Sequence, residues 1–202
     1  MLNQKEDSQM KKNQKYDKDV GSPLKELIRE SASMDQETLE LIERIEEIIM
    51  MCDREQPVYE QISSFSIALY TLGFFNCSDL MSFEDVDAQE AALILSDDFI
   101  EIKQEALPLD YRITTSKERY LMVVGDPLFP IHFAVIVNTQ SPKPFFSKLP
   151  FFGSGFDSLK ELKSEFVGID GVTTEDIHFF KKILYGEIPP ESIEKIYTIK
   201  ND

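Results

Sequence analysis

The stretch from Arg119 to Asn138 constrains the fold more than any other part of this chain. It contains two apolar runs, 120–124 and 131–137, separated by Gly-Asp-Pro-Leu-Phe-Pro at 125–130. A glycine and two prolines interrupt a helix or a central strand, so this spacing predicts a β-hairpin. Neither run alternates with polar residues, which is typical of strands covered on both faces. We therefore expect helices from earlier and later in the chain to pack on its two sides.

The length and composition of the chain bound the number of domains. With 202 residues, of which 42% are hydrophobic, the chain is long enough for one core and short for two. We expect a single α+β domain over residues 21–202, after a disordered polar tail, residues 1–20. No apolar run approaches the roughly 20 residues that cross a bilayer, and no apolar signal-peptide core is apparent. These features predict a cytoplasmic protein without membrane insertion, in which Cys52 and Cys77 are reduced.

The first part of the expected domain, residues 21–97, has the apolar spacing of helices. Its start signals are Ser-Pro, capping patterns of Ser followed three residues later by Gln or Asp, and a further proline. These signals predict four helices: a short one from Pro23, one from Ser33 to about residue 52, one from Pro57 to Gly73, and one from Ser82 to about residue 96.

The second part, residues 98–202, changes to a strand pattern. Strands are expected at 99–103 and 111–115, and with the hairpin they predict a largely antiparallel sheet of about four strands. Residues 140–156 show no period and are expected to be irregular. Two C-terminal helices are predicted, from Asp157 or Ser158 to about Phe166 and from Thr173 or Thr174 to Gly186, and residues 191–199 fit either a helical turn or an edge strand. The expected fold is α+β: an N-terminal helical layer, a central antiparallel sheet and two C-terminal helices.

The acidic side chains are concentrated in the helical part. The chain has a formal net charge of −16, and residues 21–103 alone hold five basic side chains against nineteen acidic ones. Nucleic acids and anionic membranes are bound by clustered lysine and arginine, so this distribution argues against direct binding to either. It favours a basic protein partner, and solubility alone is the other explanation.

The second predicted helix carries the first group of candidate binding residues. Its polar face holds five glutamates and a single basic residue, which are Glu37, Glu40, Glu43, Glu46, Glu47 and Arg44. Such a face is ordinarily a solvated surface, and the alternative is a docking face for a basic partner. On the docking interpretation, Glu40, Glu43 and Glu47 contact the partner.

The phenylalanine-rich segment 144–156 carries the second group. Four of its rings are the candidate binding residues: Phe145, Phe146, Phe151 and Phe152. An irregular segment with so many rings either folds them onto the sheet or leaves some exposed as apolar anchors for a partner. Both interpretations stay open at the level of sequence.

A short charged pattern allows one catalytic alternative. Glu101-Ile-Lys103, with Asp98 just before it, is similar to the ExK element of metal-dependent nucleases, in which carboxylates hold a divalent ion and lysine assists the attacking water. The pattern is common by chance, and so acidic a nuclease would repel its substrate. His132 and His178 are flanked by large apolar residues, which indicates structural roles, and no spacing requires them to meet.

The sequence thus favours binding over catalysis. We hypothesise a non-catalytic cytoplasmic protein of adaptor, chaperone-like or inhibitor-like type, without metal or cofactor, that engages a basic protein partner by long-range attraction and an apolar anchor. One alternative is a metal-dependent hydrolase or nuclease that uses Asp98, Glu101 and Lys103. The other alternative is a structural subunit of a larger assembly.

Overall fold

The computed structural model describes most of the chain between residues 23 and 184. The described residues are 23–29, 35–52, 54, 62–75, 77, 79–80, 82, 84–169 and 171–184. The predicted tail 1–20 and the ambiguous segment 191–199 lie outside the described residues. Within the described ranges, no helix is long and apolar enough to cross a membrane.

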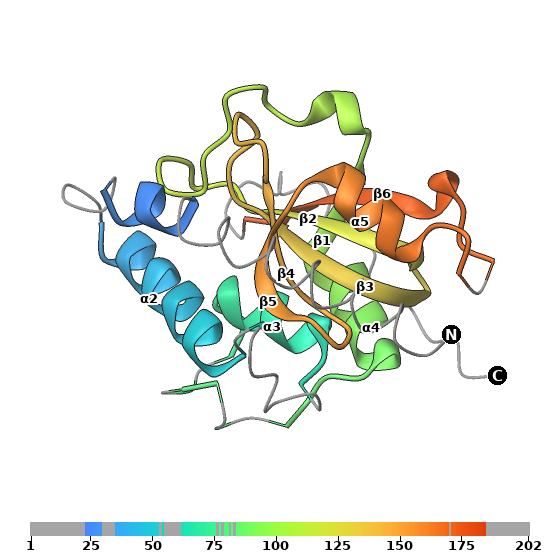
Figure 1. Cartoon of the computed structure of the whole chain (residues 1–202), viewed down its shortest axis with the longest axis horizontal. Helices are drawn as coiled ribbons and strands as arrows, with labels where there is room; N and C mark the ends of the chain where they lie inside the picture. The colour runs from blue at the N-terminus through green and yellow to red at the C-terminus, as the bar shows by residue number, and fades with distance from the viewer. Residues whose placement is uncertain are drawn as a thin grey trace, which may run out of the picture.

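An antiparallel sheet forms the centre of the protein (Figure 1). Its order is β1-β6-β2-β3-β4-β5, and all neighbours are antiparallel. The six strands are β1 (Phe99–Ile102), β2 (Tyr120–Asp126), β3 (Phe129–Ile136), β4 (Phe145–Leu149), β5 (Gly153–Asp157) and β6 (Ile177–Lys182). The combination of helices with this sheet confirms the predicted α+β class. The expected number of about four strands is wrong, because three of the six came from segments that were predicted as loop or helix.

The predicted central hairpin is confirmed as β2 and β3. Leu121 pairs with Val135 and Val123 pairs with Phe133, and the register shifts after Val124 because β3 contains one extra residue there. All positions of β2 from Tyr120 onward are buried except the last, Asp126. A strand buried on both faces explains why the sequence showed so little polar alternation.

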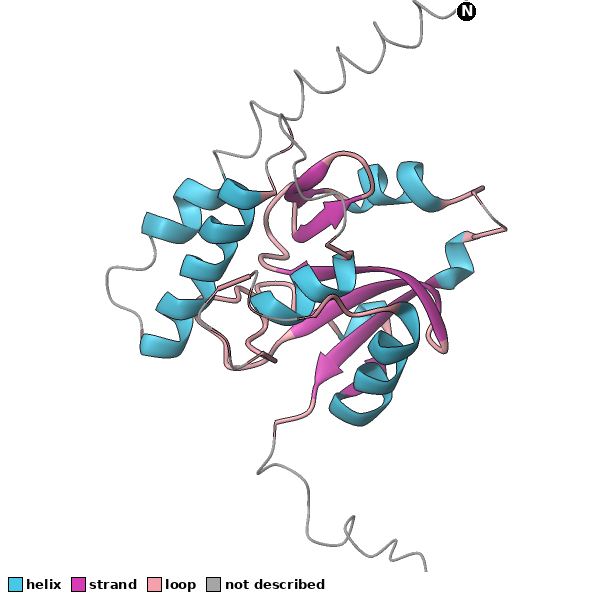
Figure 2. Ribbon diagram, turned by 90° about the horizontal axis from the view of Figure 1, so that it is seen from below, coloured by secondary structure: helices cyan, strands magenta, loops and turns pink. Residues whose placement is uncertain are grey.

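Elements from both sides of the hairpin in sequence cover the two faces of the sheet. Phe133 and His132 are consecutive in β3, so their side chains point to opposite faces. The ring of Phe133 meets Phe65 of α3 edge-on, with centroids 4.9 Å apart. The ring of His132 lies on the other face, 4.5 Å from that of Phe166 in α5. Figure 2 shows the sheet between α4 on one side and α5 on the other, which confirms the predicted double covering.

In the part of the chain that the structure describes, four longer helices lie around the sheet, and a further helical segment covers residues 23–29. They are α2 (Gln36–Met51), α3 (Ser64–Thr71), α4 (Ala88–Asp98) and α5 (Leu159–Phe166). Their N-caps are Asp35, Ser63, Asp87 and Ser158, each of which accepts a hydrogen bond from the first turn with its side chain. The start predicted for α5 is therefore confirmed.

The starts predicted for the preceding helices are less accurate. The capping pattern at Ser82 is wrong, because Asp87 and Glu90 form the capping box of α4 five residues later. Ser33 and Pro57 lie outside the described residues, and α2 and α3 are capped by Asp35 and Ser63. Several Ser, Thr and Asp residues compete for each N-cap, so the pattern locates a helix better than its first residue.

Three predictions in the second part are wrong. Residues 111–115 form a turn with a single bridge from Arg112 to Asn138, and not a strand. The helix expected from Thr173 is one 3-10 turn, η3 (Thr174–Asp176), followed by β6. The reason is tertiary: β6 fills the gap between β1 and β2, where Phe179 and Phe180 are buried. The segment 140–156, expected to be irregular, contains β4 and most of β5.

Candidate functional site

Helix α2 lies at the edge of the molecule (Figures 1 and 2). Its apolar side packs against the core. Leu41, Ile45 and Ile48 are buried under it, and its solvent side carries the predicted acidic residues. The structure thus presents one long helix face to solvent. At its C-terminal end, that face continues with Met50, whose side chain is 82% exposed.

The glutamates of this face differ in what they contact. Arg44 lies 3.5 Å from Glu40, in an i,i+4 ion pair near the surface. Glu37, which was not among the predicted binding residues, pairs with the buried Arg119 at 3.3 Å. Glu43 is exposed, and no hydrogen bond or ion pair of its carboxylate occurs within the described part of the chain. Glu43 is therefore the carboxylate best placed to meet a partner.

Glu47 has a structural role. Its two oxygens accept hydrogen bonds from the Tyr70 hydroxyl and, at 3.0 Å, from the Leu80 amide. Burial, assisted by this bond to Glu47, raises the pKa of Tyr70. Because both oxygens of Glu47 are engaged, its predicted contact with a partner stays a prediction and would compete with these two bonds.

The phenylalanine-rich segment separates into core and surface rings. Phe145 and Phe146 are buried in β4, so they are core residues and cannot serve as surface anchors; Phe156 joins them. Phe152 is half-buried and packs against the core. Phe151 lies at the turn between β4 and β5 with 79% of its side chain exposed. Of the four candidate rings, Phe151 alone is available as a large exposed anchor.

Phe151 also has an unusual backbone. Its φ is +65°, and it is the only residue other than glycine with a positive φ in the described part of the chain. In this region an L-residue brings its Cβ close to the following carbonyl oxygen, at a cost of about 1–2 kcal/mol. An exposed ring on a strained backbone contributes nothing evident to the stability of the fold.

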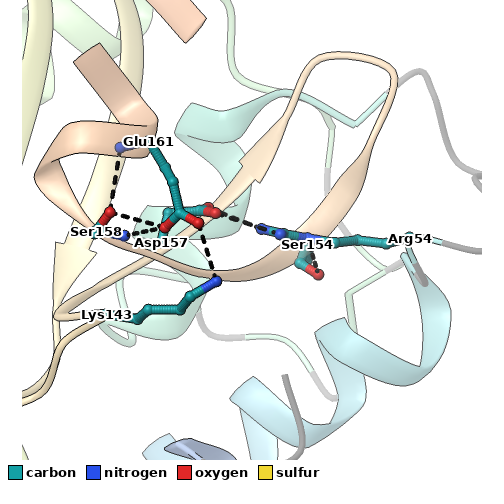
Figure 3. Close-up of polar contacts among 6 residues, drawn as sticks. All are labelled: Arg54, Lys143, Ser154, Asp157, Ser158 and Glu161. Carbon is teal, nitrogen blue, oxygen red and sulfur yellow. Dashed lines mark hydrogen bonds and ion pairs between the residues drawn. The ribbon is translucent and has the colours of Figure 1, made fainter. Parts of the chain in front are cut away.

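The β4–β5 hairpin is attached to the end of α2. The carbonyl of Cys52, the C-cap of α2, accepts a hydrogen bond of 2.8 Å from the amide of Ser154 in β5. Arg54 follows, and its guanidinium reaches the Asp157 carboxylate with Nη2–Oδ2 at 2.8 Å and Nη1–Oδ1 at 3.3 Å (Figure 3). Both views agree that the hairpin lies beside the C-terminal end of α2.

The Arg54–Asp157 pair is buried, which makes it the strongest polar link in this region. The Arg54 side chain is 7% exposed and that of Asp157 is fully buried. Arg54 Nε also donates to the Ser154 carbonyl at 3.2 Å. Burial raises the pKa of Asp157, and the charge of Arg54 opposes this rise. Neither residue was singled out from the sequence, since nothing local links positions 103 residues apart.

Gly155 makes room for this arginine. A Cβ built on Gly155 would lie 2.5 Å from Arg54 Nε, closer than side-chain atoms approach one another. The guanidinium of the distant Arg54 therefore fills the space beside Gly155 that a side chain would otherwise occupy in this strand. This is the physical reason why β5 was missed.

Some of the residues predicted for a metal-dependent hydrolase or nuclease lie close together, and others do not. Glu101 of β1 and His178 of β6 form a close pair, with Oε1 and Nδ1 2.8 Å apart. Both residues line an open depression of about 430 Å³, and Lys103 lines it too. Asp98 lies instead near Lys182, toward the other end of β6. Within the described residues, no group of three or more His, Cys, Asp or Glu side chains is arranged to hold a metal ion.

The two histidines lie on opposite faces of the sheet. His178 pairs with Val123, which is on the face of Phe133, and His132 pairs with Val124 on the other face. His132 is buried, and its Nε2 has no hydrogen-bond partner among the residues that the structure describes. Burial lowers the pKa of His132 to about 3. The structural role expected for His132 fits this environment, and the two rings cannot share a site.

One surface feature was not anticipated. The tip of the β2–β3 hairpin exposes three apolar side chains: Leu128 at 68%, Phe129 at 75% and Ile131 at 46%. A signal was present in the sequence, because the tip of a hairpin faces solvent and polar turn residues are usual there.

No protein-family model, no curated protein and no solved structure matches this chain.

Proposed function

We propose that this is a non-catalytic protein-binding protein that engages a basic protein partner through one continuous surface. This α2 surface consists of Glu40, Glu43, Met50 and Phe151. The observation that supports the proposal best is Phe151, whose ring is exposed and whose backbone is strained at the tip of a hairpin fastened to α2. Strain of this kind is a starting point for a functional hypothesis.

The charge of the α2 surface selects the kind of partner. Along α2 the acidic residues outnumber the basic ones by five to one, and Arg44 is already paired with Glu40. Arg54, which follows α2 in the chain, is turned inward and pairs with the buried Asp157. The surface therefore keeps a negative potential that attracts positively charged proteins and speeds encounter.

Two apolar side chains supply the short-range part of the interaction. Met50 of α2 and Phe151 of the attached β4–β5 hairpin are both large apolar residues that are exposed, at 82% and 79%. Methionine adapts to different partner surfaces, and phenylalanine buries a large area at low entropic cost. Long-range attraction followed by burial of such anchors is typical of protein interfaces. An adaptor, chaperone-like or inhibitor-like role fits this mechanism.

The test is affinity capture of the full chain from its native host, with mass spectrometry at low and at high salt. The Glu43→Lys/Phe151→Ser variant removes one exposed carboxylate and the exposed ring. The matched control is Asp110→Lys/Leu109→Ser, which makes the same changes in an exposed loop elsewhere. We expect a basic protein that both the wild type and the control capture. The amount of it captured by the variant should be lower by roughly tenfold or more.

Salt provides the second criterion. Attraction between exposed charges is screened over about 10 Å at 0.1 M salt, so the same protein should be lost as salt rises. Equal capture by the variant would overturn the α2 surface as the site. Failure to recover any basic protein at low salt would overturn the proposed function itself.

A further inference from the structure

A second surface lies at the end of the sheet away from α2 (Figure 1). The register places the ends of four strands there: β1 and β2 finish where β3 and β6 begin. Ile102 pairs with Phe179, Val124 pairs with Ile177, and η3 packs against β2. We call this region the hairpin end, and it comprises residues 101–105, 126–131 and 175–178.

The apolar part of the hairpin end is held in a defined shape. Asp126 Oδ1 accepts a hydrogen bond of 2.9 Å from the Leu128 amide, which fixes the turn. Gly125 has a φ of +95°, and a Cβ there would lie 2.9 Å from Ile131 Cγ1. The missing side chain of Gly125 thus lets Ile131 lie against the hairpin, beside Leu128 and Phe129. These three apolar side chains are exposed to solvent at a hairpin tip whose turn is held in one conformation.

A depression of about 430 Å³ lies at the same end of the sheet. Its apolar walls are Ile102, Ile177 and Phe179. Its polar lining consists of two carboxylates, one lysine, one amide and one imidazole, which are Glu101, Glu105, Lys103, Gln104 and His178. A lysine or arginine side chain matches this combination, because its aliphatic stem packs on apolar walls while its cationic head meets carboxylates.

The charges around the turn are mainly negative. Five carboxylates belong to the hairpin end, with Lys103 as its one lysine or arginine: Glu101, Glu105, Asp126, Glu175 and Asp176. Hydrogen bonds from the Thr173 amide and hydroxyl lower the pKa of Asp176, so this group is anionic at neutral pH. A second copy of this chain would bring a surface of the same sign, which disfavours self-association through this end.

We propose that the hairpin end is a second interaction surface, at which Leu128, Phe129 and Ile131 bind apolar side chains of a basic protein segment whose lysine or arginine enters the acidic depression. This inference does not rest on the α2 surface, since the residues involved lie at the other end of the sheet. One protein with two such surfaces can contact a basic partner at two places or join two partners.

The experiment uses short synthetic peptides of alternating lysine and phenylalanine, with lysine–serine and glutamate–phenylalanine peptides for comparison. Binding to the full chain is measured by fluorescence anisotropy, and contacts are located from amide chemical shifts. The lysine–phenylalanine peptide should bind best and should shift amides of residues 101–105 and 126–131. Leu128→Ser/Phe129→Ser should weaken this binding roughly tenfold, the size of effect expected for interface anchors.

The matched control is Met50→Ser/Phe151→Ser, which removes two exposed apolar side chains from the α2 surface. This control should leave the shifts at the hairpin end unchanged, so failure of one proposed surface is distinguishable from failure of the other. Glu105→Gln/Glu175→Gln changes only exposed carboxylates and should also weaken binding. It serves as a second variant if the apolar substitutions disturb folding.

Three results would overturn the proposal. The first is a lysine–serine peptide that binds as tightly as the lysine–phenylalanine peptide, because the apolar turn would then contribute nothing. The second is a set of amide shifts that avoids the hairpin end. The third is self-association of the wild type in sedimentation experiments that Leu128→Ser/Phe129→Ser abolishes, since the occupant would then be a second copy.

Discussion

The two hairpins of the sheet form in different ways, although both expose a phenylalanine at the tip. Phe129 of the β2–β3 hairpin is 75% exposed, and Phe151 of the β4–β5 hairpin is 79% exposed. The first hairpin consists of apolar, β-branched strands whose pattern alone predicts them. The second contains Gly-Ser-Gly in one strand and is completed by Arg54, a residue that precedes it by about 100 positions in the chain.

This difference separates local from distant causes of strand formation. In β2 and β3, side chains that favour strands also supply the burial. In β5, Gly155 has no side chain to pack, and the Arg54 guanidinium occupies that space while it neutralises Asp157. The β4–β5 hairpin, and with it Phe151, should therefore depend on one ion pair.

Arg54→Ala tests this dependence and should have the largest effect. It leaves the Asp157 carboxylate buried without its partner, and removal of one member of a buried pair costs about 3–5 kcal/mol. Urea unfolding at neutral pH measures the loss. The double variant Arg54→Leu/Asp157→Leu leaves no unpaired charge. It should therefore regain much of the free energy of unfolding that Arg54→Ala loses. A loss for Arg54→Ala below about 1 kcal/mol would show that the hairpin does not need the pair.

Acid should act on the two hairpins in opposite directions. His132 of β3 has its pKa lowered to about 3 from 6.5, so the unfolded chain binds its proton first and stability falls as pH drops below 6.5. The expected loss from this group is roughly 1 kcal/mol per pH unit. The pKa of Asp157 is raised above its ordinary value of 3.8, so the folded state binds that proton first, and this group adds stability as pH falls from the raised pKa toward 3.8.

Variants separate these two contributions in urea unfolding measured across the acid range. His132→Leu removes the buried imidazole and should flatten the fall in stability below pH 6.5. In Arg54→Ala the cost of the substitution should shrink as Asp157 becomes protonated and neutral. An unchanged acid slope in His132→Leu would mean that His132 is not kept neutral by burial.

The parts of the fold that the sequence predicts are those with local causes. The central hairpin, β1 and the start of α5 at Ser158 follow from apolar pattern and capping, which neighbouring residues determine. The strand β6 was predicted as a helix, because its burial comes from β1 and β2 on either side. Such long-range pairing is not visible in a window of sequence.

The candidate site shows the same division. The exposure of Glu43 follows from helical periodicity, and it was predicted. The role of Glu47 was not, because its partners Tyr70 and Leu80 come from distant segments. The burial of Phe145 and Phe146, and the exposure of Phe151, depend on a turn that a sequence of phenylalanines, prolines and glycines does not specify.

Gly155→Ala isolates the contact with Arg54 and should cost about 2 kcal/mol, in the range for overpacking a core. A double-mutant cycle gives the sharper result. In the Arg54→Ala background the new methyl group meets no guanidinium, so Gly155→Ala should cost much less there. Gly125→Ala in the other hairpin is strained by its own φ of +95° and should keep its cost in both backgrounds. If the losses in free energy of unfolding for Gly155→Ala and Arg54→Ala simply add, the contact between Gly155 and Arg54 does not support the β4–β5 hairpin as proposed.

Phe151→Gly should have the smallest effect, and its sign is the informative part. Glycine adopts a φ of +65° without the clash of a Cβ, so the variant should be more stable than the wild type by roughly 0.5–1 kcal/mol in thermal unfolding. Phe129→Gly is the matched control at the other tip, where φ is not positive, and it should be destabilising.

A residue whose removal stabilises the fold is kept for another reason, and on the proposed function that reason is contact with the partner. Phe151→Gly should therefore capture less of the basic protein while unfolding at a higher temperature. A variant that loses stability, or that binds as the wild type does, would remove Phe151 from the α2 surface.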